Sequence, residues 1–132
     1  MKRTKVIETS QAERDAMDEY LKGYGFCGKL IRLARYERAY FGDGEVSEDF
    51  PGEMPLSRAR MFEVRHFLME LPNGDEKLLL YYHYIQGHSV ERCAELLGIA
   101  RASGYRLKKR ALALAIEYDK KRRREWGTRN EE

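Results

Sequence analysis

The sequence contains few of the residues that mark secreted or membrane-spanning proteins. Its 132 residues include two cysteines, three prolines and one tryptophan, and their mean hydropathy is −0.72. Two cysteines, Cys27 and Cys93, are too few for a disulfide framework, so we expect both to be reduced and buried. No apolar run approaches the roughly 18 residues of a membrane span. Charged residues directly follow the basic start at 1–5, which argues against a secretory signal.

Patterns that indicate catalysis or metal binding are missing as well. There is no Gly-x-Ser-x-Gly motif, no recognisable cysteine–histidine pair and no glycine-rich phosphate loop. The three histidines, His66, His83 and His88, do not combine with the cysteines in any zinc-site spacing. The length also excludes a TIM barrel, which needs roughly 250 residues. We therefore expect a small protein that is not an enzyme and needs neither a cofactor nor a metal ion.

Charge is plentiful and unevenly distributed along the chain. Charged residues make up 36% of the sequence, and the formal net charge is +3. Residues 101–132 carry eleven Lys and Arg against five Asp and Glu, a net charge of +6. Residues 1–100 carry the other fourteen basic and seventeen acidic residues, a net charge of −3. A basic C-terminal quarter on an acidic body suggests that this end of the protein binds a polyanion.

Apolar periodicity predicts an all-α protein, with no strand alternation and no internal repeat. Residues 1–41 are expected to form an N-terminal arm followed by helices. Because three glycines interrupt the pattern, we expect either two helices, over 11–23 and 28–41, or one kinked helix. Residues 42–56 are rich in turn-forming and acidic residues, which predicts an acidic loop.

Residues 57–118 are expected to form a compact helical DNA-binding domain. Ser57 is a good N-cap for its first helix. A second helix is expected over 77–86, preceded by two acidic residues that the helix dipole favours. Residues 119–132 add a basic helix end and tail. The run KKRRR at 120–124 either contacts phosphates or forms a solvated helix end.

A helix-turn-helix is predicted within this domain. Its first helix covers 90–97 and ends at Gly98, which supplies the positive φ of the turn. The small side chain of Ala94 lets the two helices approach closely, and Ile99 fills the gap between them. A long second helix begins at Arg101 and continues to about residue 124. A turn of this kind directs the first residues of its second helix into the major groove of DNA.

The residues at the start of the second helix are suited to DNA contact. Arg101 can bond a guanine edge, Ala102 can touch a thymine methyl group, and Ser103 can bond either kind of base edge. A cation at a helix N-terminus is unfavourable, and a base or phosphate acceptor beside Arg101 would offset that cost. The expected base-reading residues are Arg101, Ala102, Ser103 and Arg106. The expected phosphate-binding residues are Ser89, Tyr105, Lys108, Lys109 and Arg110.

Four short segments resemble region four of bacterial sigma factors. They read YIQGHS at 84–89, CAELLGIAR at 93–101, YRL at 105–107 and RAL at 110–112. They are more similar still to the sigma-like late-gene activators of phages, of the ArpU and RinA type. The resemblance covers about 57–116. It implies a cytoplasmic transcription regulator of a bacterium or phage-infected cell, without membrane attachment, that binds double-stranded DNA and can contact RNA polymerase.

Two residues depart from the pattern of that family. Ala100 stands where such proteins usually carry a capping Ser or Thr, and loss of a cap costs roughly 1 kcal/mol. Gly104 stands where a β-branched residue normally packs, so we expect a small void beside it.

Other functions stay open at this point. The helix pair can belong to a protein-interaction module that contacts RNA polymerase and binds DNA weakly, or to a phage DNA-packaging component similar to a small terminase subunit. It can also be a pair of helices that only pack together. The oligomeric state is open too, because Ile116 and Tyr118 need cover from the N-terminal helices or from a second chain, as in a homo-oligomer.

Overall fold

The computed structural model describes residues 9–41 and 53–130. These residues form the helices α1 (Gln11–Phe41), α2 (Glu53–Glu70), α3 (Asp75–Leu80), α4 (Val90–Leu97) and α5 (Arg101–Asn130), and one turn of π-helix, η2 (Tyr81–Ile85). No strand occurs in these two ranges, so the prediction of an all-α protein is confirmed for the described chain. None of these helices combines the length and the apolar character that crossing a membrane requires.

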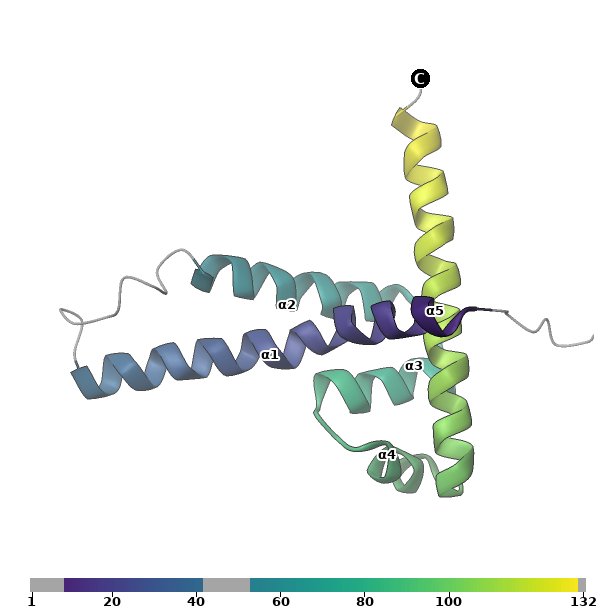
Figure 1. The fold of residues 1–132 in the computed structure, drawn as a ribbon, viewed down its shortest axis with the longest axis horizontal. Helices are drawn as coiled ribbons and strands as arrows, with labels where there is room; N and C mark the ends of the chain where they lie inside the picture. The colour runs from purple at the N-terminus through teal and green to yellow at the C-terminus, as the bar shows by residue number, and fades with distance from the viewer. Residues whose placement is uncertain (1–8, 42–52, 131–132) are drawn as a thin grey trace, which may run out of the picture.

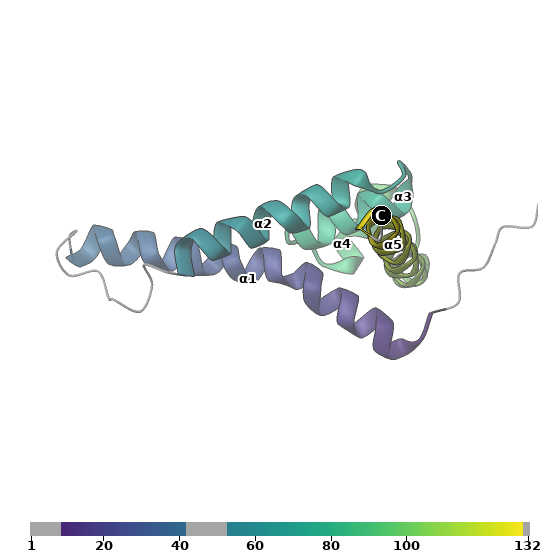
Figure 2. The same ribbon diagram turned by 90° about the horizontal axis from the view of Figure 1, so that it is seen from above.

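The helices are arranged as a long hairpin crossed by a long helix. Helices α1 and α2 lie side by side and antiparallel, and α5 crosses them steeply near one end of the pair (Figure 1). Elements α3, η2 and α4 pack together beside the N-terminal half of α5. The other end of the hairpin extends away from all of these elements (Figures 1 and 2). The fold therefore has a compact base and a projecting arm.

Helix α1 is one element rather than two, although its direction changes near the middle (Figure 2). The glycines that were expected to interrupt it lie inside the helix. A Cβ atom at Gly23 would lie 3.3 Å from Nε of Arg60, and one at Gly28 would lie 3.5 Å from Cε of Met61. Each interior glycine costs roughly 1 kcal/mol in an isolated helix. Close packing against α2 offsets that cost, so tertiary contacts override the local signal.

Helix α2 begins earlier than the sequence pattern indicated. It starts at Glu53, so residues 53–56, which were expected to belong to the loop over 42–56, are helical. The rest of that loop lies outside the described residues. Ser57 is therefore not an N-cap. It lies inside α2 and is buried. Pro55 falls in the first turn, where a proline does not remove an intrahelical hydrogen bond.

The helix expected over 77–86 begins earlier, at Asp75, and changes its geometry partway along. Helix α3 ends at Leu80 and continues as η2, in which the amide of Gln86 bonds the carbonyl of Tyr81 at 3.1 Å. Leu79 is buried, whereas Leu78 is exposed. Within the π-helical turn, the side chain of Tyr84 is buried and its hydroxyl donates to Asp18 on α1.

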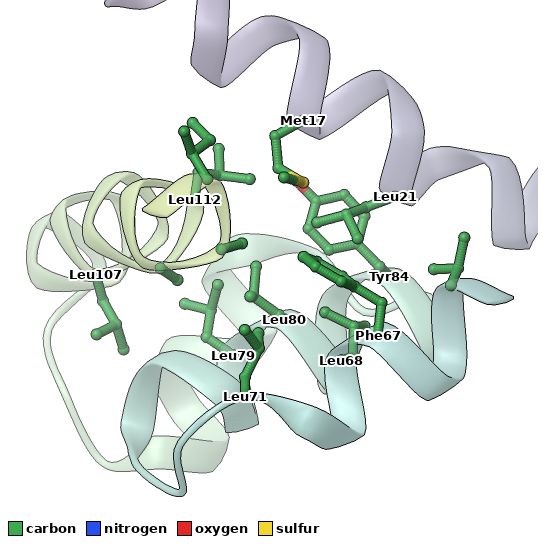
Figure 3. Packing of buried hydrophobic residues seen from close by; sticks show 14 of the residues in the cluster. Met17, Leu21, Phe67, Leu68, Leu71, Leu79, Leu80, Tyr84, Leu107 and Leu112 are labelled. Atoms are coloured by element: carbon green, nitrogen blue, oxygen red, sulfur yellow. The ribbon is translucent and has the colours of Figure 1, made fainter. Parts of the chain in front are cut away.

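A single core joins the hairpin to the other helices. Side chains from α1, α2, α3 and α5 meet in one cluster, which Figure 3 shows from close by. Its labelled members are Met17, Leu21, Phe67, Leu68, Leu71, Leu79, Leu80, Tyr84, Leu107 and Leu112. The N-terminal helix therefore shares a core with the expected DNA-binding domain.

The same core covers the residues of α5 for which a partner was needed. Ile116 is buried, and Tyr118 packs its ring 5.8 Å from that of Phe67 and donates its hydroxyl to Glu70 at 2.6 Å. Helix α2 covers Tyr118, and Ile116 lies in the core to which both α1 and α2 contribute, which removes that argument for a second chain. Helix α5 extends to Asn130, past the expected domain boundary between residues 118 and 119 and past the expected helix end near residue 124.

Candidate nucleic-acid interface

The short helix, the turn and the long helix expected from residue 90 onward are present as α4, the turn at Gly98 and α5. The hydroxyl of Ser89 accepts from the backbone amide of Arg92 at 3.1 Å, which caps α4. Helix α4 ends at Gly98, whose φ of 69° places it in the left-handed region that glycine adopts without strain. Ile99 follows, with its amide bonded to the carbonyl of Ala94 at 2.9 Å, and packs partly buried against the core.

Gly104 is where α5 touches α4, and this contact corrects the prediction of a void. A Cβ atom at Gly104 would lie 3.0 Å from Cβ of Ala94 and 3.5 Å from the carbonyl oxygen of Val90. Carbon atoms in good contact are about 3.5–4.0 Å apart. A side chain at this position would therefore require α4 and α5 to move apart by a few tenths of an ångström. Ala94 and Gly104 together set the separation of the two helices.

The first turns of α5 present a basic outward side. Ala102 and Arg106 are exposed, Ser103 is partly exposed, and Nη2 of Arg106 donates to Oγ of Ser103 at 3.3 Å. With Lys109 and Arg110, Ser103 and Arg106 line a shallow depression of about 410 Å³. None of these three cations pairs with a carboxylate in the described ranges. This side can therefore attract an anion without first giving up an ion pair.

Glu91 is a member of this surface that sequence reasoning missed. Its Oε1 accepts from Nη2 of Arg101 at 3.1 Å and from the hydroxyl of Tyr105. The hydrogen bond from Tyr105, a hydrogen bond from the backbone amide of Glu91 itself, and the hydrogen bond and charge of Arg101 together lower the pKa of Glu91 to about 2. A carboxylate of the protein, rather than a nucleic acid, therefore offsets the cost of Arg101 at the start of α5. The only signal in the sequence is an acidic residue in the first turn of α4, which the helix dipole also explains.

Lys108 lies on another side of α5 from Lys109 and Arg110. Its Nζ is 3.6 Å from Oδ1 of Asp18, and the side chain is 26% exposed. Asp18 also accepts from Nζ of Lys22 at 2.8 Å and from the hydroxyl of Tyr84. Burial raises the pKa of Asp18, but these hydrogen bonds and the charge of Lys108 outweigh it, so the pKa falls below its ordinary value. Lys108 thus joins α5 to α1 and is not part of the basic outward side.

The basic run at 120–124 forms ion pairs with residues of α1, α2 and α5. Lys120 pairs with Glu13 of α1, and Arg123 pairs with Asp119 one turn back at 3.1 Å. Arg122 lies 3.9 Å from a carboxylate oxygen of Glu70 and has its guanidinium carbon 5.6 Å from the centroid of Phe67. Lys120, Arg122 and Arg123 therefore have carboxylate partners within the protein although their side chains remain exposed.

Two of the histidines contact other groups of the protein, and both cysteines are buried. Nε2 of His66 lies 2.6 Å from Oε1 of Glu70, and Nδ1 of His83 donates to the carbonyl of His88 at 2.7 Å. Burial lowers the pKa of His83. Cys27 and Cys93 are buried free thiols, as predicted. Nowhere in residues 9–41 and 53–130 do three potential metal ligands gather.

Most of the site residues expected from the sequence lie on or beside one basic surface at the start of α5. Ser103, Arg106, Lys109 and Arg110 share one surface, Arg101 and Tyr105 are held beside it by Glu91, and Lys108 is elsewhere. No protein-family model, no curated protein and no solved structure matches this chain.

Proposed function

We propose that the protein is a sequence-specific DNA-binding transcription regulator, without enzymatic activity, that inserts the N-terminal turns of α5 into the major groove. One observation carries the proposal. Directly after the turn at Gly98, α5 presents Arg106, Lys109 and Arg110 on one side with no carboxylate partner in the described chain. A helix of this diameter fits the major groove, and unpaired cations on its leading turns match the charge of the phosphates.

We assign the contacts with DNA bases to the first two turns of α5. Arg106 projects from the exposed side and is suited to the O6 and N7 acceptors of guanine, and Ala102 is suited to a thymine methyl group. Arg101 reads a base while keeping its bond to Glu91, because a guanidinium has five N–H donors. Glu91 therefore orients Arg101, and it keeps the hydroxyl of Tyr105 at the edge of the surface.

We assign the contacts with DNA phosphates to the residues that flank these turns. Lys109 and Arg110 lie about one turn beyond the base-reading positions, which suits them to one DNA strand. The hydroxyl of Ser89 and the amides at the start of α4 suit the opposite strand, because a helix N-terminus attracts phosphate. Lys108 has no part in this contact because it is paired with Asp18.

Selection of bound duplexes from a random pool, followed by titration of the selected site, tests the proposal. Arg106→Ala should lose about 1–3 kcal/mol of affinity for that site, a factor of roughly 5 to 150, because one bidentate base contact is removed. Arg65→Ala is the matched control, since Arg65 is an exposed arginine of α2 away from the turn. A pool that yields no preferred sequence, or an Arg106→Ala protein that binds as tightly as the Arg65→Ala protein, would contradict the proposal.

A further inference from the structure

Glu91 is an acidic side chain at the border of the surface that we assign to DNA. It lies in the first turn of α4, and its side chain is 35% exposed. The tight turn at Gly98 returns the chain so that the start of α5 packs on this end of α4. A Cβ atom at Gly104 would lie 3.5 Å from the carbonyl oxygen of Val90, the residue before Glu91. Glu91 is therefore held between the two helices, next to the first turns of α5.

Two residues of α5, one turn apart, fix this carboxylate. Oε1 of Glu91 accepts from Nη2 of Arg101 at 3.1 Å and from the hydroxyl of Tyr105. Because the pKa of Glu91 is lowered to about 2, the group is ionised at neutral pH and only accepts hydrogen bonds. A carboxylate that is fixed in place and always ionised can discriminate between a hydrogen-bond donor and an acceptor on a ligand.

Both members of the Arg101–Glu91 pair keep unused hydrogen-bonding capacity. A carboxylate has about four accepting positions, and Tyr105, Arg101 and the backbone amide of Glu91 fill three of those of Glu91. A guanidinium has five N–H donors, of which the bond to Glu91 uses one. The side chain of Arg101 is 75% exposed. The pair thus offers a donor and an acceptor, side by side, to a molecule outside the protein.

We propose that Arg101 and Glu91 together read one G·C base pair, with Arg101 over guanine and Glu91 over cytosine. In this base pair N4 of cytosine donates to O6 of guanine, so a donor and an acceptor lie about 2.9 Å apart on the major-groove edge. The bonded atoms of Arg101 and Glu91 are 3.1 Å apart, which matches that spacing with donor and acceptor exchanged. The inference rests on the proposed function, because it names the base pair that the same surface recognises.

The other three base pairs complement the Arg101–Glu91 pair less well. A C·G or an A·T pair would place an amino group under Arg101, and two donors facing each other form no hydrogen bond. A T·A pair would offer O4 of thymine to Arg101 and the amino group of adenine to Glu91, but it would set the carboxylate beside N7 of adenine, which is an acceptor. Only G·C gives Arg101 two acceptors, O6 and N7, and gives Glu91 a donor.

Glu91→Gln separates base reading from a role in positioning Arg101 alone. The amide oxygen of glutamine still accepts from Arg101 and Tyr105, whereas its NH2 group donates to N7 of adenine and opposes the amino group of cytosine. At one base pair of the selected site, the preference for G·C over T·A should therefore fall by roughly 5- to 150-fold. Glu95→Gln is the matched control, since Glu95 also lies on α4 but pairs with Arg92, and it should keep every preference.

Competition binding measures these preferences on duplexes in which each base pair of the selected site is replaced in turn by the other three. Each preference is a ratio for one protein, so a change in the folded fraction cancels. Arg101→Ala should lose its preference at the same base pair as Glu91→Gln, because the two residues read it together.

Two results would overturn the inference and leave the proposed function standing. One is a Glu91→Gln protein with the same base preferences as Glu95→Gln, which would limit Glu91 to positioning Arg101. The other is a change of preference at different base pairs for Glu91→Gln and Arg101→Ala. A random pool that yields no preferred sequence would overturn the proposed function, and this inference with it.

Discussion

Gly104→Ala should destabilise the protein although it removes a glycine from a helix interior. The new Cβ would lie 3.0 Å from Cβ of Ala94, which is about 0.5–1 Å closer than a good carbon contact. Neither atom belongs to a flexible side chain, so α4 or α5 has to shift. Overpacking of this kind costs roughly 1–3 kcal/mol, and loss of the glycine penalty returns up to about 1 kcal/mol. The expected net loss is about 0.5–2 kcal/mol of unfolding free energy.

Urea denaturation of three further variants makes this reasoning testable. Gly25→Ala should gain about 0.5–1 kcal/mol, because nothing lies within 4 Å of a Cβ atom there and only the helix propensity changes. Ala94→Gly should make room for the methyl group, so the double variant Ala94→Gly/Gly104→Ala should show a favourable coupling energy relative to the single variants. If Gly104→Ala stabilised the protein as much as Gly25→Ala does, the close approach of α4 and α5 would be refuted.

Two further predictions concern the ion pairs of the base. Because its pKa is lowered to about 2, Glu91 contributes stability that is complete above about pH 4.5 and is lost as the pH falls toward 2. In urea denaturation measured against pH, Glu91→Gln should lack this part of the loss of stability in acid. A pH profile identical to that of the unmodified protein would count against the Glu91 bonds to Arg101 and Tyr105. Asp18→Ala should lower the free energy of unfolding by about 1–3 kcal/mol in urea denaturation, because it leaves the buried hydroxyl of Tyr84 unpaired. The same substitution should lower it less in a Tyr84→Phe background. Equal losses in both backgrounds would contradict the contact.

The connection of α4 to α5 through a tight turn could be predicted from the sequence because its signals are local. A cap at Ser89, a positive φ at Gly98 and a small residue at Ala94 all act within ten residues, and each appears in the structure in its expected role. The basic outward side of α5 could be predicted in the same way, since residues three and four apart in a helix share one side. Ser103 and Arg106 illustrate this, since they lie together in the structure.

The remaining features depend on residues that are far apart in the sequence. The glycines of α1 are tolerated because α2 packs on them, and Lys108 turns to α1 because Asp18 is there, 90 positions earlier in the chain. The partner of Arg101 is Glu91 on the preceding helix, ten residues away. Helix periodicity carries no information on such pairings. Gly104 shows the same limit, because a missing side chain indicates a void or a close contact equally well until the neighbour is known.

The salt dependence of duplex binding tests the role of α5 most directly. If Lys109 and Arg110 each neutralise about one phosphate, the logarithm of the binding constant should fall against the logarithm of salt concentration with a slope at least as steep as about −1.8 per chain. Lys109→Ala/Arg110→Ala should make the slope shallower by about 1.8, and Arg65→Ala should leave it unchanged. Absence of duplex binding at low salt, or an equal slope for all three proteins, would contradict the assignment of this side of α5 to DNA.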